Sequence, residues 1–391
     1  MTAFKKIFFS LYMSVFLSSL GLGILSPILP SYVDQLAASS LILGVVFGAY
    51  PAARTLLMPL IGRLSDSMGW RPFIFAGLAL FTAVSPLYAL SHSAVQLMLV
   101  RFLQGIAAAM LLPVAMSVIG KLSPQGREGF VMGSFTSAFF AGLGFGPLIG
   151  GFLRDFYSIN AAFYSMGILA FLALITSVFT LKSAPPDPIQ VPAGPKVHNP
   201  WRIIRDAPLM GLLLFRFARA VGIGLVWVIM PLYAARDLGI SAFQVGILLS
   251  ANTFLTTIFQ APFGYLADRI GHVRSLTAGS FIAAASIASI GFSSSFWQLL
   301  AISVGLGLSG SMIVPSGSAL AVSLGRTRGM GSVMGLFNSS LSFGTMIGPV
   351  AGGWLLDLNG VRTVFPAGAF LAMAGLVCLL VLYREVEISK V

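Results

Sequence analysis

The sequence has very little charge and almost no cysteine. Only 9% of its 391 residues are charged, against about a quarter in soluble globular domains, whereas 57% are hydrophobic. A water-soluble protein of this length needs more charge to cover its surface, so the composition excludes a soluble or a disordered chain and indicates a protein embedded in lipid. The single cysteine, Cys378, lies in an apolar run, which excludes a disulfide framework and a thiolate metal site.

Acidic residues and histidines are also scarce. The chain has 11 Asp and Glu residues and 3 His residues. All three histidines fall between the apolar segments, and the sequence contains no HExxH metal spacing and no Walker-type phosphate loop. We therefore predict that the protein is not an enzyme and holds no cofactor and no metal ion.

Long apolar segments dominate what is present. A membrane-spanning helix needs roughly 20 mostly apolar residues. The sequence predicts an all-α integral membrane protein with twelve transmembrane helices, which form two six-helix pseudo-repeats. The predicted spans lie near residues 7–30, 41–61, 72–91, 94–117, 131–153, 161–182, 208–230, 241–262, 275–292, 296–320, 331–355 and 364–383.

The positions of Lys and Arg predict the topology. With the N-terminus in the cytoplasm, the inside segments hold sixteen basic residues and the outside segments hold three. We predict a multi-pass protein of the cytoplasmic (inner) membrane with both termini in the cytoplasm. This asymmetry also explains the net charge of +12, so the charge does not indicate a nucleic-acid partner.

A proline-rich segment and an internal repeat divide the chain. Prolines crowd residues 183–207, so this segment is predicted to be a cytoplasmic linker between an N-terminal half, 1–182, and a C-terminal half, 208–391. Segments of the two halves match at a constant offset of 202 residues, as in Gly146-Pro147 with Gly348-Pro349 and Asp155 with Asp357. The repeats are therefore parallel, and a substrate site is expected near mid-membrane between them.

Four motifs resemble those of the major facilitator superfamily, and two of these resemble its twelve-helix drug:proton antiporter branch. They are Gly62-x-Leu64-x-Asp66-x-x-Gly69-x-Arg71, Arg101-x-x-Gln104-Gly105, Gly142-x-x-x-Gly146-Pro147-x-x-Gly150-Gly151 and Gly21-x-Gly23-x-x-x-Pro27-x-x-Pro30. The resemblance implies a secondary active transporter that works by alternating access and exports small amphiphilic molecules in exchange for protons. Its partners would be a small-molecule substrate, protons and the lipid bilayer, and we expect a monomer.

The resemblance also implies roles for two groups of glycine-containing segments. A carboxylate just past the inner end of a span is expected to face the positive end of a neighbouring helix, and glycines there to let backbones approach. The alternative is a solvated turn. The predicted gating residues are Gly62, Asp66, Gly69, Arg71, Gly264, Asp268 and Gly271. The predicted helix-packing motif, for which ordinary close packing is the alternative, comprises Gly142, Gly146, Pro147, Gly150, Gly348, Pro349 and Gly352.

Arginines inside the predicted spans are functional candidates, because a charge at mid-helix costs roughly 2.5–3.5 kcal/mol on insertion scales. For Arg101 we expect coupling to protons through a pair with Asp34, although Asp34 could equally be a solvated loop acid. The other arginines could bind substrate or reach the membrane interface. The predicted substrate-binding residues are Tyr50, Arg54, Arg216, Arg219, Trp227, Asn252 and Asn338.

The lack of an acidic residue deep in any predicted span leaves a second function open. Unpaired guanidinium groups favour carboxylates, phosphates or sulfonates as ligands. The alternative to an amphiphile exporter is therefore a carrier or exporter of organic anions or anionic lipids that needs no proton coupling.

Overall fold

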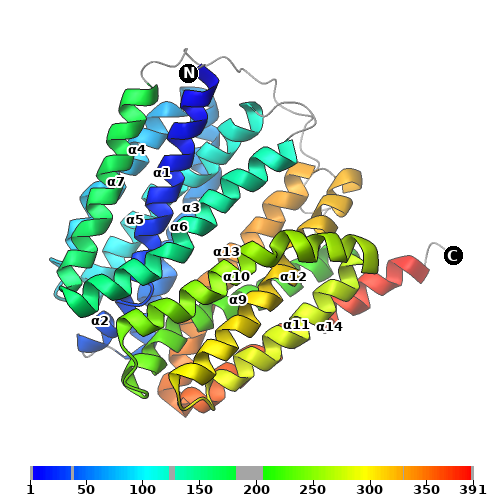
Figure 1. Cartoon of the computed structure of the whole chain (residues 1–391). Coiled ribbons are helices and arrows are strands. Elements are labelled where there is room, and N and C mark those ends of the chain that lie inside the picture. The colour runs from blue at the N-terminus through cyan, green and yellow to red at the C-terminus, as the bar shows by residue number, and fades with distance from the viewer. Residues whose placement is uncertain (1–2, 37–38, 123–127, 182–205, 329, 389–391) are drawn as a thin grey trace. The chain divides into compact units, whose positions relative to one another are not determined.

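The computed structural model describes residues 3–36, 39–122, 128–181, 206–328 and 330–388, and this part of the chain is all-helical (Figure 1). Its elements are α1 (Ala3–Leu25), α2 (Leu29–Gln35), α3 (Ser40–Met68), α4 (Arg71–Val84), η1 (Ser85–Tyr88), α5 (Ala94–Leu122), α6 (Glu128–Phe156), α7 (Ile159–Leu181), α9 (Ala207–Arg236), α10 (Ala242–Ile270), α11 (His272–Ile290), α12 (Phe296–Arg328), α13 (Met330–Asn359) and α14 (Val361–Ile388).

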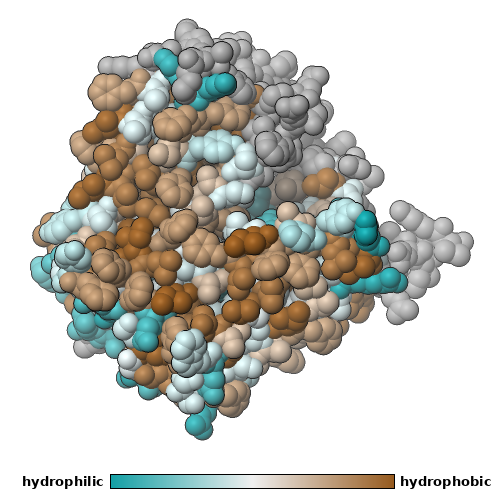
Figure 2. Space-filling model, in the orientation of Figure 1, coloured by the Kyte–Doolittle hydropathy of each residue, from teal (hydrophilic) through white to brown (hydrophobic). Residues whose placement is uncertain are grey.

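Eleven helices in the described ranges are long and apolar enough to cross a membrane. The remaining predicted span, 331–355, lies within α13, which is itself 30 residues long. Large apolar side chains such as Phe179, Trp297 and Phe370 are about three-quarters exposed, and apolar side chains cover much of the face in Figure 2. Such exposure is stable only against lipid, so the all-helical membrane fold predicted from the sequence is confirmed.

Prolines interrupt two of the predicted spans. The first span, predicted over 7–30 as one helix, ends at Leu25 and restarts as α2 at Leu29. Pro27 lies in the intervening turn and has no N–H to continue the helix. The third span likewise passes from α4 into the 3-10 helix η1, where Pro86 occupies the first turn. Both predictions of an unbroken helix were therefore wrong at these positions.

Internal contacts divide the chain into two units. The first unit comprises Met1–Ala38, Val45–Pro192 and Ala235–Ser250, and the second comprises Ser39–Gly44, Ala193–Ala234 and Ala251–Val391. In the first unit, α1 packs against α6 and α7, and α4 packs against α5 and α7. In the second unit, α11 packs against α12 and α14, and α12 packs against α13. Nearly all of the predicted linker, 183–207, lies outside the described residues, so the predicted halves stay a prediction.

The starts of two helices, α3 and α10, are counted with a different unit from the rest of the helix. The start of α3 is counted with the second unit, and the start of α10 is counted with the first. These two helix starts are equivalent in the internal repeat, since they lie 202 residues apart in the sequence.

Candidate functional site

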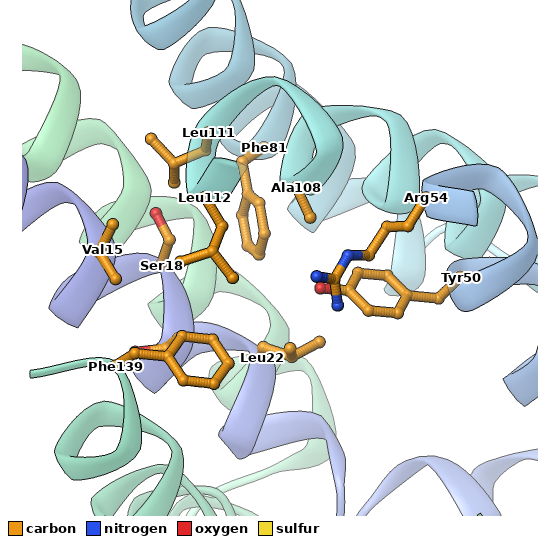
Figure 3. A pocket seen from close by; sticks show the side chains of 11 residues that line it. Val15, Ser18, Leu22, Tyr50, Arg54, Phe81, Ala108, Leu111, Leu112 and Phe139 are labelled. Carbon is orange, nitrogen blue, oxygen red and sulfur yellow. The ribbon is translucent and has the colours of Figure 1, made fainter. Parts of the chain in front are cut away.

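A pocket of about 340 Å³ lies within the first unit (Figure 3). Its walls are almost entirely apolar, and five helices contribute to them. Polar groups enter it from α1, through Ser18 and Ser19, and from α3, through Tyr50 and Arg54. The apolar lining residues are Val15, Leu22, Phe81, Ala108, Leu111, Leu112 and Phe139.

Two arginines lie close to the ring of Tyr50. The guanidinium carbon of Arg54 is 5.6 Å from the centre of the Tyr50 ring, and that of Arg101 is 5.0 Å from it. Arg101 also lies 5.1 Å from the ring centre of Phe47. Aromatic faces attract cations at these distances, so two positive charges share one tyrosine beside the pocket. The structure thus brings Arg101, to which the sequence assigned proton coupling, together with Tyr50 and Arg54, to which it assigned substrate binding.

Arg101 forms its side-chain hydrogen bond with an amide and not with a carboxylate. Its Nη1 donates to Oε1 of Gln104 at 3.1 Å, and the same oxygen accepts the hydroxyl of Tyr88 at 2.7 Å. Arg101, Gln104 and Tyr88 are all buried. Gly105 permits this arrangement, because a Cβ there would lie 2.5 Å from the carbonyl oxygen of Tyr50 and hold α5 away from α3. The Arg-x-x-Gln-Gly motif therefore combines a close helix contact with a buried polar group.

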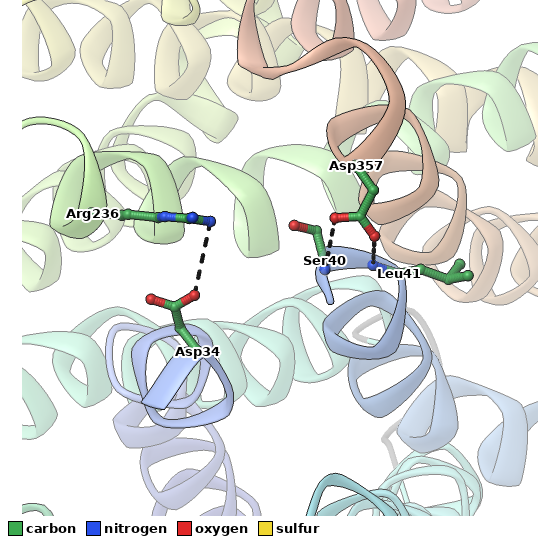
Figure 4. Close-up of polar contacts among 5 residues, drawn as sticks. All are labelled: Asp34, Ser40, Leu41, Arg236 and Asp357. Carbon is green, nitrogen blue, oxygen red and sulfur yellow. Dashed lines mark hydrogen bonds and ion pairs between the residues drawn. The ribbon is translucent and has the colours of Figure 1, made fainter. Parts of the chain in front are cut away.

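Asp34, the predicted partner of Arg101, lies elsewhere in this structure. Its Oδ1 is 3.9 Å from Nη1 of Arg236 (Figure 4), and the side chains of both residues are well exposed, 40% for Asp34 and 61% for Arg236. The predicted Asp34–Arg101 pair is therefore not formed here. Asp34 lies on the short helix α2, whereas Arg101 is buried within α5 and contacts Gln104. A pair this exposed is weak, typically below about 1 kcal/mol.

In the second unit, Arg216 stacks on an aromatic ring. Its guanidinium carbon is 3.6 Å from the ring centre of Phe337, which is 2% exposed. Nε of Arg216 has no hydrogen-bond partner among the described residues. Of the other residues predicted to bind substrate in this unit, Arg219, Trp227 and Asn252 are half-buried and Asn338 is exposed. No hydrogen bond, ion pair or ring contact among the described residues joins these four into one cluster.

In both predicted gating segments the helix is followed by a glycine with a positive φ angle. Gly69 follows α3 with φ of 86°, and Gly271 follows α10 with φ of 97°. L-amino acids with a side chain rarely adopt such angles, which explains the glycine at both positions. The guanidinium carbon of Arg71 lies 5.4 Å from the ring centre of Trp70.

Two expectations for these gating segments are not met. A Cβ at Gly62 would meet no described atom within 4 Å, and one at Gly264 would be 3.5 Å from Pro315, so neither glycine marks a close backbone approach. Asp268 contacts Nε2 of His272 at 3.5 Å, at the start of α11, and not the helix start expected from the sequence. The side chain of Asp66 lies outside the described residues.

The predicted helix-packing motif does mark close approach. A Cβ at Gly146 would lie 2.6 Å from Cα of Gly23, and one at Gly348 would lie 2.5 Å from the carbonyl oxygen of Val221. Backbone lies on the other side in both cases and cannot move aside. Similar contacts surround the rest of the motif: Gly142 with Phe16 and Ser19, Gly150 with Ile24, Pro349 with Gly224, Pro147 with Gly246, and Gly352 with Leu225.

Sequence reasoning gave no role to Asp155 and Asp357, which the structure places at two helix N-termini. Oδ1 and Oδ2 of Asp357 accept the backbone N–H groups of Ser40 and Leu41, each at 2.9 Å (Figure 4). Oδ1 and Oδ2 of Asp155 accept those of Ala242 and Phe243 at 3.3 and 2.7 Å. A carboxylate satisfies N–H groups that a helix start leaves free and opposes the helix dipole. The sequence did contain a signal for these two caps: the offset of 202 residues relates Asp155 to Asp357, and it also relates the helix start at Ser40 to the one at Ala242.

Comparisons with known proteins agree with this architecture along the whole chain. An uncharacterized MFS-type transporter of Methanocaldococcus jannaschii is 29% identical over 387 residues, which cover 98% of this chain and 99% of the relative. The quinolone resistance protein NorA of Staphylococcus aureus is 26% identical over 391 residues, with 96% of each chain covered.

Solved structures of low sequence identity share the fold. The human organic anion transporter MFSD10 (TETRAN) superposes with a TM-score of 0.70 at 18% identity over 96% of this chain and 99% of that chain. The nucleoside transporter NupG gives a TM-score of 0.78 at 14% identity over 96% of this chain and 100% of that chain. The profile of the Major Facilitator Superfamily matches residues 11–218 and again 212–390. With its helix-packing glycines and its two motif-bearing loops, this chain belongs to the Major Facilitator Superfamily, whose members are transporters.

Proposed function

We propose that this secondary transporter exports small amphiphilic molecules in exchange for protons. It would work by alternating access in the cytoplasmic (inner) membrane, as a monomer with both termini in the cytoplasm. The excess of basic residues in the predicted inside segments supports this orientation. Proton exchange is supported by the resemblance of the motifs in the first and fifth predicted spans to those of drug:proton antiporters.

The observation that carries the proposal is the pocket of the first unit. Its apolar walls suit the lipophilic part of a ligand, and the polar groups of Tyr50 and Arg54 at one side suit a polar head. A relative whose name records resistance to quinolones, which are amphiphilic, supports the same class of cargo.

The glycine contacts along α6 and α13 supply packed surfaces on which such a transporter can move its helices. Gly146 and Gly348 bring backbones together without intervening side chains. Close packing of this kind allows only discrete arrangements, as a two-state transport cycle requires. Asp155 and Asp357 would hold the starts of α10 and α3 in the state described here.

For proton coupling we propose Asp34, with Arg236 as its ion-pair partner. Protonation of Asp34 removes its charge, so Arg236, 3.9 Å away, would be released from the pair. Because both side chains are accessible to water, a proton from the outside could reach the pair directly. Arg101 would respond indirectly, through the helices that hold it.

The test is transport in proteoliposomes with and without an imposed proton gradient, using an amphiphilic dye as cargo. We expect the gradient to drive accumulation of the dye. Asp34→Asn should abolish that accumulation but retain downhill exchange, whereas Asp237→Asn, an exposed acid nearby, should change neither. Accumulation that does not depend on the gradient would contradict proton coupling, and loss of downhill exchange in Asp34→Asn would indicate a role in folding or binding.

A further inference from the structure

We propose that the pocket of the first unit is the binding subsite for the acidic head of an anionic amphiphile, such as an aryl or alkyl carboxylate or sulfonate. This inference rests on the proposed function, because it names the charge of the cargo that the same pocket would take. Two polar groups without partners, an excess of positive charge and a set of apolar walls support it independently.

Arg54 lacks a hydrogen-bond acceptor in the described structure. Its Nε is shielded from solvent and has no hydrogen-bond partner among the described residues, and its guanidinium carbon lies 5.6 Å from the centre of the Tyr50 ring. Figure 3 shows the guanidinium beside the Tyr50 hydroxyl, on the side of α3 that faces the pocket. A buried N–H group without a partner is costly, so the site is incomplete unless an acceptor fills it. A planar oxyanion fits a guanidinium best, because it accepts two parallel hydrogen bonds.

A second group without a partner enters the same pocket from another helix. Ser18 in α1 is 6% exposed, and its Oγ has no hydrogen-bond partner among the described residues. A hydroxyl can donate to an anionic oxygen while Arg54 contributes charge. Donors on α1 and α3 that converge on one cavity are typical of a site that fixes the orientation of a ligand.

The local charge favours an anion. The guanidinium of Arg101 lies against the same tyrosine as that of Arg54, and neither arginine forms an ion pair within the described ranges. Three of the described carboxylates have other partners, since Asp34 contacts Arg236 while Asp155 and Asp357 cap helices. In a site of low dielectric constant, two uncompensated positive charges repel a cation strongly and attract an anion.

The remaining walls define the other end of the ligand. Leu22, Phe81, Leu111, Leu112 and Phe139 surround the cavity with aliphatic and aromatic carbon. A fully hydrophilic anion would gain nothing from them, whereas an aromatic ring or a short alkyl chain would be removed from water. The preferred ligand is therefore an anion that carries an apolar body.

The experiment compares two ligands that differ in the sign of their charge. Purified protein in nanodiscs of neutral phosphatidylcholine is titrated calorimetrically with 2-naphthalenesulfonate and with trimethyl(2-naphthyl)ammonium. We expect the sulfonate to bind more tightly to the wild type. Arg54→Gln should weaken the sulfonate about tenfold or more, the effect of losing a hydrogen bond to a charged group, and should leave the ammonium ligand unchanged or tighter.

Three further variants control the interpretation. Ser18→Ala should weaken the sulfonate about threefold, as expected for one hydroxyl hydrogen bond. Arg54→Lys should fall between the wild type and Arg54→Gln, because it keeps the charge and loses the planar fork. Arg362→Gln, which removes an exposed arginine from the start of α14, should change neither affinity. Thermal melting of each variant verifies that it is folded.

The inference is overturned if the ammonium ligand binds the wild type as tightly as the sulfonate, or if Arg54→Gln and Ser18→Ala weaken both ligands equally. Binding is measured without a proton gradient. Failure of proton-coupled export would therefore leave this result intact, and a transporter that exports cations with a proton gradient would contradict only the anionic subsite.

Discussion

Gly105 in α5 and Gly307 in α12 occupy equivalent positions of the two repeats. A Cβ at Gly105 would lie 2.5 Å from the carbonyl oxygen of Tyr50, and one at Gly307 would lie 2.8 Å from that of Asn252, which is again the equivalent residue. The same correspondence holds for the caps, where Asp155 and Asp357 accept N–H groups from equivalent helix starts. In their backbone contacts the two repeats are alike.

The polar side chains beside these contacts differ between the repeats. At three equivalent positions the first repeat has charged or amide side chains that the second repeat lacks. Arg54 corresponds to Thr256, Arg101 to Ser303 and Gln104 to Leu306. The hydroxyl of Thr256 donates a hydrogen bond to the carbonyl oxygen of Gly307 at 3.1 Å. Backbone packing therefore serves the fold in both repeats, whereas the charge at these positions is present only in the first repeat and is available for ligand recognition.

The largest expected effect would break the likeness of the two repeats at their packing glycines. Gly146→Ala places a Cβ against Cα of Gly23, and Gly348→Ala places one against the carbonyl of Val221. Both neighbours are backbone, so we expect each variant to lose about 3 kcal/mol of stability, the upper part of the range for overpacking. The measurement is thermal unfolding in nanodiscs. Gly335→Ala, where no described atom lies within 4 Å, should lose nothing, and unequal losses at Gly146 and Gly348 would show that the repeats are not equivalent here.

The next effect sharpens the difference in polar side chains. Gln104→Leu gives the first repeat the residue of the second, and it leaves the buried Tyr88 hydroxyl and Arg101 without their acceptor. We expect a loss of about 2 kcal/mol, since an unsatisfied buried polar group costs about 1–3 kcal/mol. A double-mutant cycle with Tyr88→Phe tests the cause, because removing the hydroxyl should recover part of the loss. Additive effects of the two substitutions would exclude the shared hydrogen bond as the reason.

A smaller effect is expected at the two helix caps, and it should be equal in the two repeats. Asp155→Ala and Asp357→Ala each remove an acceptor of two backbone N–H groups, which typically costs about 1 kcal/mol. Unfolding of each single variant and of the double variant measures this, with Asp237→Ala as an exposed control. If removing one of the two carboxylates leaves the stability unchanged, the two caps form equivalent hydrogen bonds but do not contribute equally to stability.

The smallest effect concerns pH at one of these caps. Burial by itself raises the pKa of Asp357, but the N–H of Leu41, together with the groups of Ser40 and Ser39, outweighs it and holds the pKa below its ordinary value. The folded protein therefore binds this proton less readily than the unfolded chain. Its contribution is complete above the unfolded pKa of roughly 3.9 and is lost as the pH falls through the folded value. The melting temperature of the wild type minus that of Asp357→Asn should shrink in acid below about pH 4, and a constant difference would contradict this.

Much of the fold could be predicted from the sequence because it depends on properties of consecutive residues. Hydropathy is a property of consecutive residues, so the predicted spans coincide with the helices except where Pro27 and Pro86 break them. The repeat offset and the family motifs are also linear patterns. The candidate site was predictable only as a set of residues. Tyr50 and Arg54 could be grouped from the sequence because they lie one turn apart on one helix, whereas Arg101 joins them only through the packing of α5 on α3.

The lipid environment, the helices, the duplication and the superfamily can all be inferred from linear patterns in this chain. Which distant groups meet depends on how the helices pack: Tyr88 meets Gln104, Asp34 meets Arg236, and Asp357 meets the start of α3. The physical reason is that burial in lipid depends on composition summed along a segment. A hydrogen bond or an ion pair depends instead on a few ångströms between atoms of separate segments, and those distances are set by the glycine contacts and proline breaks that position the helices.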